Sequence, residues 1–104
     1  MSRSIKSVEI NGKDWTELIA AANALAADET PPIDSIDTSA DILCVSRDVV
    51  WLLAYADTKP AADDIRGELM QRGEKNITSN ETRIYARCFN PAELGYIHVG
   101  PANA

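Results

Sequence analysis

Residues 42–56 read ILCVSRDVVWLLAYA and contain the longest apolar run of this 104-residue chain, VVWLLAYA at 49–56. Apolar residues at helical spacing predict a helix over about 40–57, and further apolar residues widen its stripe, so this helix should be the most buried element. The stripe consists of Ile42, Val45, Val49, Leu52, Leu53 and Ala56, widened by Leu43, Val50 and Trp51. A rival interpretation makes 42–45 a strand, with Ser46 capping a shorter helix.

On the N-terminal side, residues 4–10 alternate loosely between apolar and polar, and the Asn11-Gly12 turn follows, which predicts a short strand. Asp14 and Glu17 have the spacing of a capping box, and an apolar stripe at 15, 18, 19, 22, 25 and 26 predicts a helix after it. Pro31-Pro32 ends any helical run. Residues 28–38, DETPPIDSIDT, predict an acidic surface loop.

On the C-terminal side, Pro60 suits the first turn of a third helix that Gly73 ends. Thr78 and Glu81 predict a capping box and a fourth helix over about 79–89, although residues 82–89 also alternate, which leaves a strand open there. Residues 96–99 predict a short strand, for which pairing with residues 4–10 is one option. The expected fold is mainly α with a minor β component, an α+β domain of four helices spanning residues 1–104.

Composition is that of a soluble globular domain, with 45% hydrophobic and 25% charged residues. The eight-residue apolar run is far shorter than the roughly 20 residues that cross a bilayer. The N-terminus lacks the apolar region of a signal peptide. We therefore expect a cytoplasmic protein without a membrane partner, in which Cys44 and Cys88 are reduced thiols.

No motif in the chain predicts catalysis, a metal or a cofactor. His98 is the single histidine, and nothing in the sequence links it to a cysteine or a serine. Cys44, Cys88 and His98 lack the short ligand spacings of zinc modules. Asp34, Asp37 and Asp41 lack the spacing and the glycine of a calcium loop. We expect a protein that is not an enzyme, and a cleft gathering His98 with a cysteine or a carboxylate would change that view.

Charge is unevenly distributed along the chain, whose net charge is −6. Residues 28–64 contain nine of the sixteen acids and two of the ten bases, whereas residues 66–87 contain five bases and three acids. This distribution indicates separate acidic and basic surfaces for different partners.

Residues 49–99 resemble a winged helix-turn-helix domain. The order is VVWLLAYA, then TKPAADDIRGELMQRG, then NITSNETRIYARCF, then NPAELGYIHV. The resemblance implies a first helix over 60–70, a recognition helix over 79–89 and a wing entered through ELGYI. It further implies a regulator that binds duplex DNA. Because a single small module buries little DNA surface, a homodimer is one expectation.

A helical wheel over residues 79–90 supports that hypothesis, because basic and amide side chains share one face. Such a face reads bases and contacts phosphates. The predicted DNA-contacting residues are Ser79, Asn80, Arg83, Arg87 and Asn90, with backbone contacts from Arg66, Arg72 and Lys75.

The alternative is an acidic protein-binding inhibitor whose carboxylates occupy the basic groove of a nucleic-acid-binding protein. Phage-encoded inhibitors such as anti-CRISPR proteins block nucleic-acid-handling complexes in this way. The residues predicted to carry it are Asp28, Glu29, Asp34, Asp37, Asp41 and Asp48. Mimicry of this kind requires those carboxylates to share one face.

Overall fold

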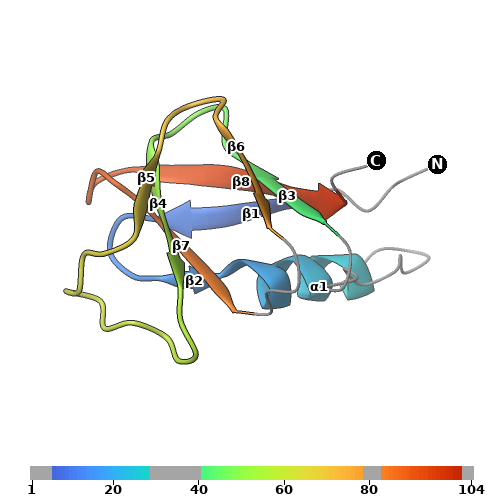
Figure 1. Ribbon diagram of the computed structural model, residues 1–104, viewed down its shortest axis with the longest axis horizontal. Coiled ribbons are helices and arrows are strands. Elements are labelled where there is room, and N and C mark those ends of the chain that lie inside the picture. The colour runs from blue at the N-terminus through green and yellow to red at the C-terminus, as the bar shows by residue number, and fades with distance from the viewer. Residues whose placement is uncertain (1–5, 29–40, 79–82, 102–104) are drawn as a thin grey trace.

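The computed structural model describes residues 6–28, 41–78 and 83–101, and within them the chain is built mostly from β-strands (Figure 1). The elements are β1 (Lys6–Asn11), β2 (Thr16–Glu17), α1 (Leu18–Asp28), β3 (Ile42–Val45), β4 (Trp51–Tyr55), β5 (Glu68–Met70), β6 (Lys75–Thr78), β7 (Ile84–Cys88) and β8 (Leu94–Pro101). They form two antiparallel four-stranded sheets, sheet A with the order β1-β8-β3-β6 and sheet B with the order β2-β7-β4-β5.

Four pairs of consecutive strands, β1–β2, β3–β4, β5–β6 and β7–β8, have one strand in each sheet, so each pair acts as one long strand bent at a corner. β3 lies between β8 and β6 in sheet A, and β4 lies between β7 and β5 in sheet B. The bent strands therefore keep the same neighbours on both sides of the corner. In the same way, β1 pairs with β8 in sheet A and β2 pairs with β7 in sheet B. Strands that switch sheets through such bends wrap both sheets around one core.

The corners touch one another, which fixes how far each strand bends. A Cβ atom at Gly12 would collide with the carbonyl oxygen of Asn90 and with Pro91, so the β1–β2 corner needs glycine to lie against the β7–β8 corner. Gly73, at φ +79°, donates its amide hydrogen to the carbonyl of Ser46 at 2.6 Å. That bond joins the β5–β6 corner to the β3–β4 corner.

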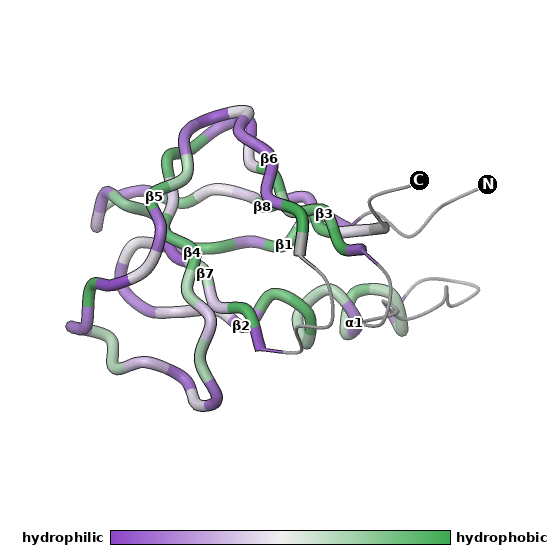
Figure 2. The backbone as a smooth tube through the Cα atoms, in the orientation of Figure 1, coloured by the Kyte–Doolittle hydropathy of each residue, from purple (hydrophilic) through white to green (hydrophobic). Residues whose placement is uncertain are grey.

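The core lies between the sheets, and α1 closes one side of it. Inward-facing residues of both sheets form one buried cluster, and Leu18, Ile19 and Ala22 of α1 join it. Figure 2 shows hydrophobic residues concentrated along β3, β4 and the start of α1, whereas the β5–β6 corner is hydrophilic. The sheet residues of the cluster are Val8, Ile10, Ile42, Cys44, Val49, Trp51, Leu53, Met70, Ile84, Ala86, Cys88, Ile97 and Val99.

Three expectations from the sequence are confirmed. The first helix exists as α1, and the predicted stripe positions Leu18, Ile19, Ala22 and Ala26 are its buried residues. It begins after β2, so Asp14 does not cap it and instead accepts a hydrogen bond from the amide of Trp15 at 2.8 Å. The N-terminal strand pairs with the C-terminal strand, β1 with β8. Residues 42–45 form the strand of the rival interpretation, although the shorter helix capped by Ser46 is not there, because β4 follows.

The mainly α, four-helix fold class is wrong. The buried helix predicted over 40–57 is instead β3, a corner and β4. The physical reason is burial on both faces of β4: Trp51 and Leu53 face the core, while Leu52 and Ala54 face the other way and are also buried. A strand covered on both sides is a continuous apolar run, which has the same composition as a buried helix.

The winged helix-turn-helix arrangement is wrong for the same region. Residues 60–73 form turns and the short strand β5, and the described part of 79–89 is the strand β7. Five consecutive buried residues in β7 place its polar Arg87 inside the protein, where a recognition helix would have exposed it. Residues 79–82 and most of the predicted acidic loop, 28–38, lie outside the described residues.

Among the described residues, α1 is the helix, and its 11 residues are too few to cross a membrane.

Candidate binding face

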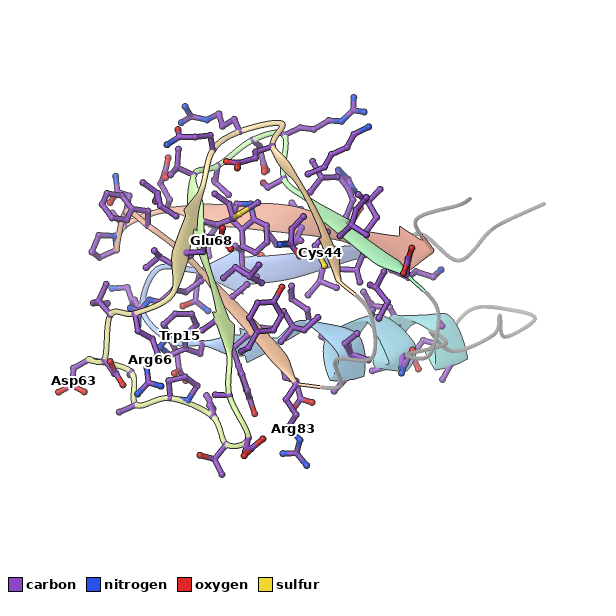
Figure 3. The ribbon with its side chains drawn as sticks, in the orientation of Figure 1. Trp15, Cys44, Asp63, Arg66, Glu68 and Arg83 are labelled. Carbon is purple, nitrogen blue, oxygen red and sulfur yellow. The ribbon has the colours of Figure 1, made fainter. Side chains whose placement is uncertain are left out.

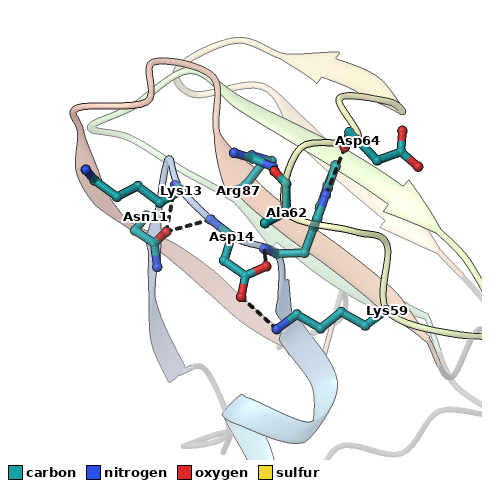
Figure 4. Close-up of polar contacts among 8 residues, drawn as sticks. Asn11, Lys13, Asp14, Lys59, Ala62, Asp64 and Arg87 are labelled. Atoms are coloured by element: carbon teal, nitrogen blue, oxygen red, sulfur yellow. Dashed lines mark hydrogen bonds and ion pairs between the residues drawn. The ribbon is translucent and has the colours of Figure 1, made fainter.

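The outer face of sheet B, which points away from the core, is covered by residues 56–67, here called the covering segment. Trp15, Leu52, Ala54 and Tyr85 form a second buried cluster on this face. The indole Nε1 of Trp15 donates a hydrogen bond to the carbonyl of Asp64 at 3.0 Å, which holds the covering segment over the cluster (Figure 4). The chain itself therefore occupies this face.

Arg87 holds the covering segment from beneath. Its side chain is 4% exposed. Nη1 donates to the carbonyl of Ala62 at 2.5 Å, and Nη2 donates to the carbonyl of Gly12 at 2.6 Å. The guanidinium carbon also lies 5.4 Å from the centre of the Trp15 ring. Two carbonyl acceptors and a ring face offset the desolvation of a buried cation, so Arg87 has a structural role.

An ion pair closes the rim of the covered face. Lys59 Nζ lies 2.8 Å from Asp14 Oδ2 (Figure 4). The hydrogen bond from Lys59 and then that from the Trp15 amide lower the pKa of the Asp14 carboxyl. Both side chains are about half exposed, so the pair adds little stability.

The outer face of sheet A differs, because large apolar side chains on it are exposed. Ile77 is 59% exposed, Tyr96 47% and Leu94 66%. Strand register arranges the face in rows across the sheet. From β6 toward β1, one row holds Ile77, Leu43 and Gly100, the next holds Lys75, Val45, His98 and Ser7, and Tyr96 and Glu9 are partners in the row after that.

An open hollow of about 700 Å³ lies over this face. Its floor is apolar and is formed by Leu43, Val45 and Gly100. Its margin carries Arg47, Lys75 and His98. A second hollow of about 400 Å³ adjoins it on the side of Tyr96 and is lined by Ser7, Arg47, Asp48, Tyr96 and His98. We call this surface of sheet A, with both hollows, the binding face.

The two cations of the binding face have no anionic partner among the described residues. Arg47 and Lys75 form no ion pair or side-chain hydrogen bond there. The nearby carboxylates are engaged elsewhere: Asp48 accepts hydrogen bonds from Ser46 Oγ and the Tyr96 amide. The net charge of the chain is negative, yet the described lining of the larger hollow contains two cations and no carboxylate.

His98 lies beside a hydroxyl and a carboxylate, which is the observation that could revive a catalytic role. Its Nδ1 lies 2.9 Å from the Ser7 hydroxyl oxygen. Asp48 lines the same hollow, but its carboxylate bonds to Ser46 and to the Tyr96 amide, and within the described residues it does not bond to the imidazole. A triad requires the acid to orient the base, and Asp48 does not do so here.

The residues predicted to contact DNA are not brought together. Arg87 is buried, and Arg66 pairs with Asp64 on the covering segment. Arg83 donates to the carbonyl of Asp57 at 2.9 Å, and Figure 3 shows it pointing away from both sheets near the start of β7. Asn90 lies in the β7–β8 corner, and Arg72 and Lys75 lie at the β5–β6 corner. Ser79 and Asn80 lie outside the described residues.

The acidic residues of the alternative hypothesis are also dispersed. Asp28 ends α1, Asp41 precedes β3 and Asp48 follows β3, so the last two lie at opposite ends of one strand. The positions of Glu29, Asp34 and Asp37 lie outside the described residues. Asp41 and Asp48 are therefore separated by the length of β3.

Both cysteines are buried free thiols in the main core cluster. Burial raises the pKa of Cys44 to about 12. Burial, with smaller effects from Glu93 and Asp48, raises the pKa of Cys88 to about 11. A protonated, inaccessible thiol is a poor nucleophile, so each serves as a small apolar core residue.

Sequence reasoning missed Arg47, Leu43, Ile77 and Tyr96 as members of one face. The sequence offered little signal for this face, because ILCV at 42–45 is apolar throughout, KNIT at 75–78 does not alternate, and LGYIHV at 94–99 alternates only weakly. Alternation does not reveal which strands are neighbours, and the face exists only through that pairing. No protein-family model, curated protein or solved structure matches this chain.

Proposed function

We propose that this chain is a non-catalytic protein-binding module that docks a partner protein on the binding face of sheet A. The observation that carries the proposal is the contrast between the two sheets. The chain covers the outer face of sheet B with its own covering segment, while the outer face of sheet A presents Ile77 and Tyr96 largely exposed beside a hollow. Contiguous exposed apolar side chains rimmed by polar groups mark interaction sites.

The composition of the binding face favours a protein over a nucleic acid. Interface centres are enriched in aromatic residues and arginine, and the face supplies Tyr96 and Arg47. Single-stranded nucleic acids need a run of cations that follows the backbone and several aromatic platforms. The described face offers two cations without partners, one tyrosine and a mostly apolar floor, within a chain of net charge −6.

The test is selection of binders from a random peptide library displayed on phage, followed by titration of a selected peptide into ¹⁵N-labelled protein. We expect amide resonances of β3, β6 and β8 to shift. Shifts confined to the covering segment, or failure to select any peptide, would refute the proposal. Salt-sensitive binding of a dT oligonucleotide to β3, β6 and β8, without peptide binding, would assign the face to nucleic acid instead.

Two exposed isoleucines provide a matched pair of variants. Ile77, on the binding face, is 59% exposed, and Ile65, on the covering segment, is 60% exposed. Ile77→Asp should abolish peptide binding, because it places a charge among the apolar contacts, while Ile65→Asp should leave binding unchanged. Equal effects of the two substitutions would contradict a docking site on sheet A.

A further inference from the structure

Two cations on the margin of the larger hollow lack an acceptor among the described residues, whereas four other cations of the chain have one. Lys59 pairs with Asp14, Arg66 pairs with Asp64, and Arg72 and Arg83 each donate to a backbone carbonyl. Arg47 and Lys75 have no such contact within residues 6–28, 41–78 and 83–101. Both border the apolar floor formed by Leu43, Val45 and Gly100.

Docking on this floor removes water from both cations. An unpaired charge that loses its water is costly, and the cost falls only if the partner supplies an opposite charge in hydrogen-bond contact. A partner that covers Val45 and Gly100 with an apolar group therefore has to bring an anion to Arg47 and Lys75. A cation of the partner placed there would be repelled, so Arg47 and Lys75 contribute to specificity as well as to affinity.

Acids of this chain near the hollow do not already supply that anion. Glu74 accepts a hydrogen bond from the amide of Gln71 at 2.9 Å, which closes the β5–β6 corner. Asp48 is held by Ser46 and the Tyr96 amide. Among the described residues no carboxylate lines the larger hollow, and at physiological ionic strength charges are screened beyond about 8 Å.

We propose that the hollow lined by Arg47, Lys75, Val45 and Gly100 is a carboxylate subsite, which receives an Asp or Glu side chain of the partner next to an apolar side chain seated on the floor. This inference rests on the proposed protein-binding function and names the chemistry of the partner. Arg47 supplies a planar fork for the two carboxylate oxygens, and Lys75 supplies a point charge from the neighbouring strand.

The experiment compares peptide-library selections on three purified proteins. Wild type should enrich Asp or Glu beside an apolar residue. The double variant Arg47→Glu with Lys75→Glu should instead enrich Lys or Arg, and it should bind the wild-type peptides about tenfold or more weakly, since each lost 1.4 kcal/mol is tenfold in Kd. The control, Lys13→Glu with Arg66→Glu, changes the net charge equally away from the hollow and should retain wild-type preference and affinity.

The outcomes separate this inference from the proposed function. One outcome is that the selected peptides lack any enrichment in Asp or Glu and yet shift the amide resonances of β3, β6 and β8. That result would overturn the carboxylate subsite and leave the docking face in place. An equal loss of affinity in the control would also overturn it, because long-range charge would then explain the effect. Peptides that bind elsewhere, or oligonucleotides that bind in their place, would overturn both.

Discussion

The guanidinium carbon of Arg87 lies 5.4 Å from the centre of the Trp15 ring, and both side chains bond to the same covering segment, at Ala62 and Asp64. This pairing explains how the chain covers the outer face of sheet B with its own segment. It also explains why a basic residue of the C-terminal half does not contribute to a DNA-binding surface.

Arg87→Met should destabilise the fold by about 3 kcal/mol. The substitution removes two hydrogen bonds from a charged donor and leaves the carbonyls of Gly12 and Ala62 without that donor, each worth about 1.5–3 kcal/mol. Urea denaturation measures the change. Arg66→Met, which loses only an exposed ion pair, should shift the midpoint little. If Arg87→Met is as stable as wild type, the side chain does not hold the segment.

Gly67→Ala should destabilise the protein by far more than Gly73→Ala. Both glycines have positive φ, 96° and 79°, so each alanine incurs about 1–2 kcal/mol of backbone strain. A Cβ at Gly67 would also collide with the backbone carbonyl of Leu53, whereas a Cβ at Gly73 meets nothing within 4 Å. Thermal unfolding of the two variants checks the order, and similar melting temperatures would show that the Gly67 contact is not rigid.

The two thiols should react slowly with a disulfide reagent such as DTNB in the native state and readily after unfolding. Burial raises their pKa values to about 12 for Cys44 and about 11 for Cys88, from an ordinary 9.0, so at pH 8 the native thiolate fraction falls by about a hundredfold or more. Because the thiol pKa values are higher in the folded state than in the unfolded state, the contribution of the buried thiols to the free energy of unfolding is fully present below pH 9. That contribution is lost as the pH rises toward 11–12. Rapid native labelling at pH 8 would contradict the buried positions.

Ser7 should not be labelled by a fluorophosphonate probe. The 2.9 Å contact with His98 supplies a base, but Asp48 does not orient the imidazole and the hollow is open. Intact-mass spectrometry of the treated protein checks this. Stoichiometric labelling that Ser7→Ala and His98→Ala both remove would establish a nucleophile and reopen a catalytic function.

The sequence by itself determined the features that depend on local periodicity. The apolar stripe at Leu18, Ile19, Ala22 and Ala26 identified the helix, although the capping pattern at Asp14 placed its start too early. Loose alternation identified β1 and β8 and allowed their pairing. These features survive because helix and half-buried strand differ in period.

Only the tertiary structure decided the rest. β4 lies between a core and a covering segment, so Leu52 and Leu53 are both buried and the strand loses the alternation that would distinguish it from a helix. Arg87 is buried because a segment 25 residues away in the chain folds over it. The binding face brings together Arg47, Lys75 and His98 from strands or corners far apart in sequence. Strand pairing decides which residues are neighbours, and no local sequence pattern encodes that pairing.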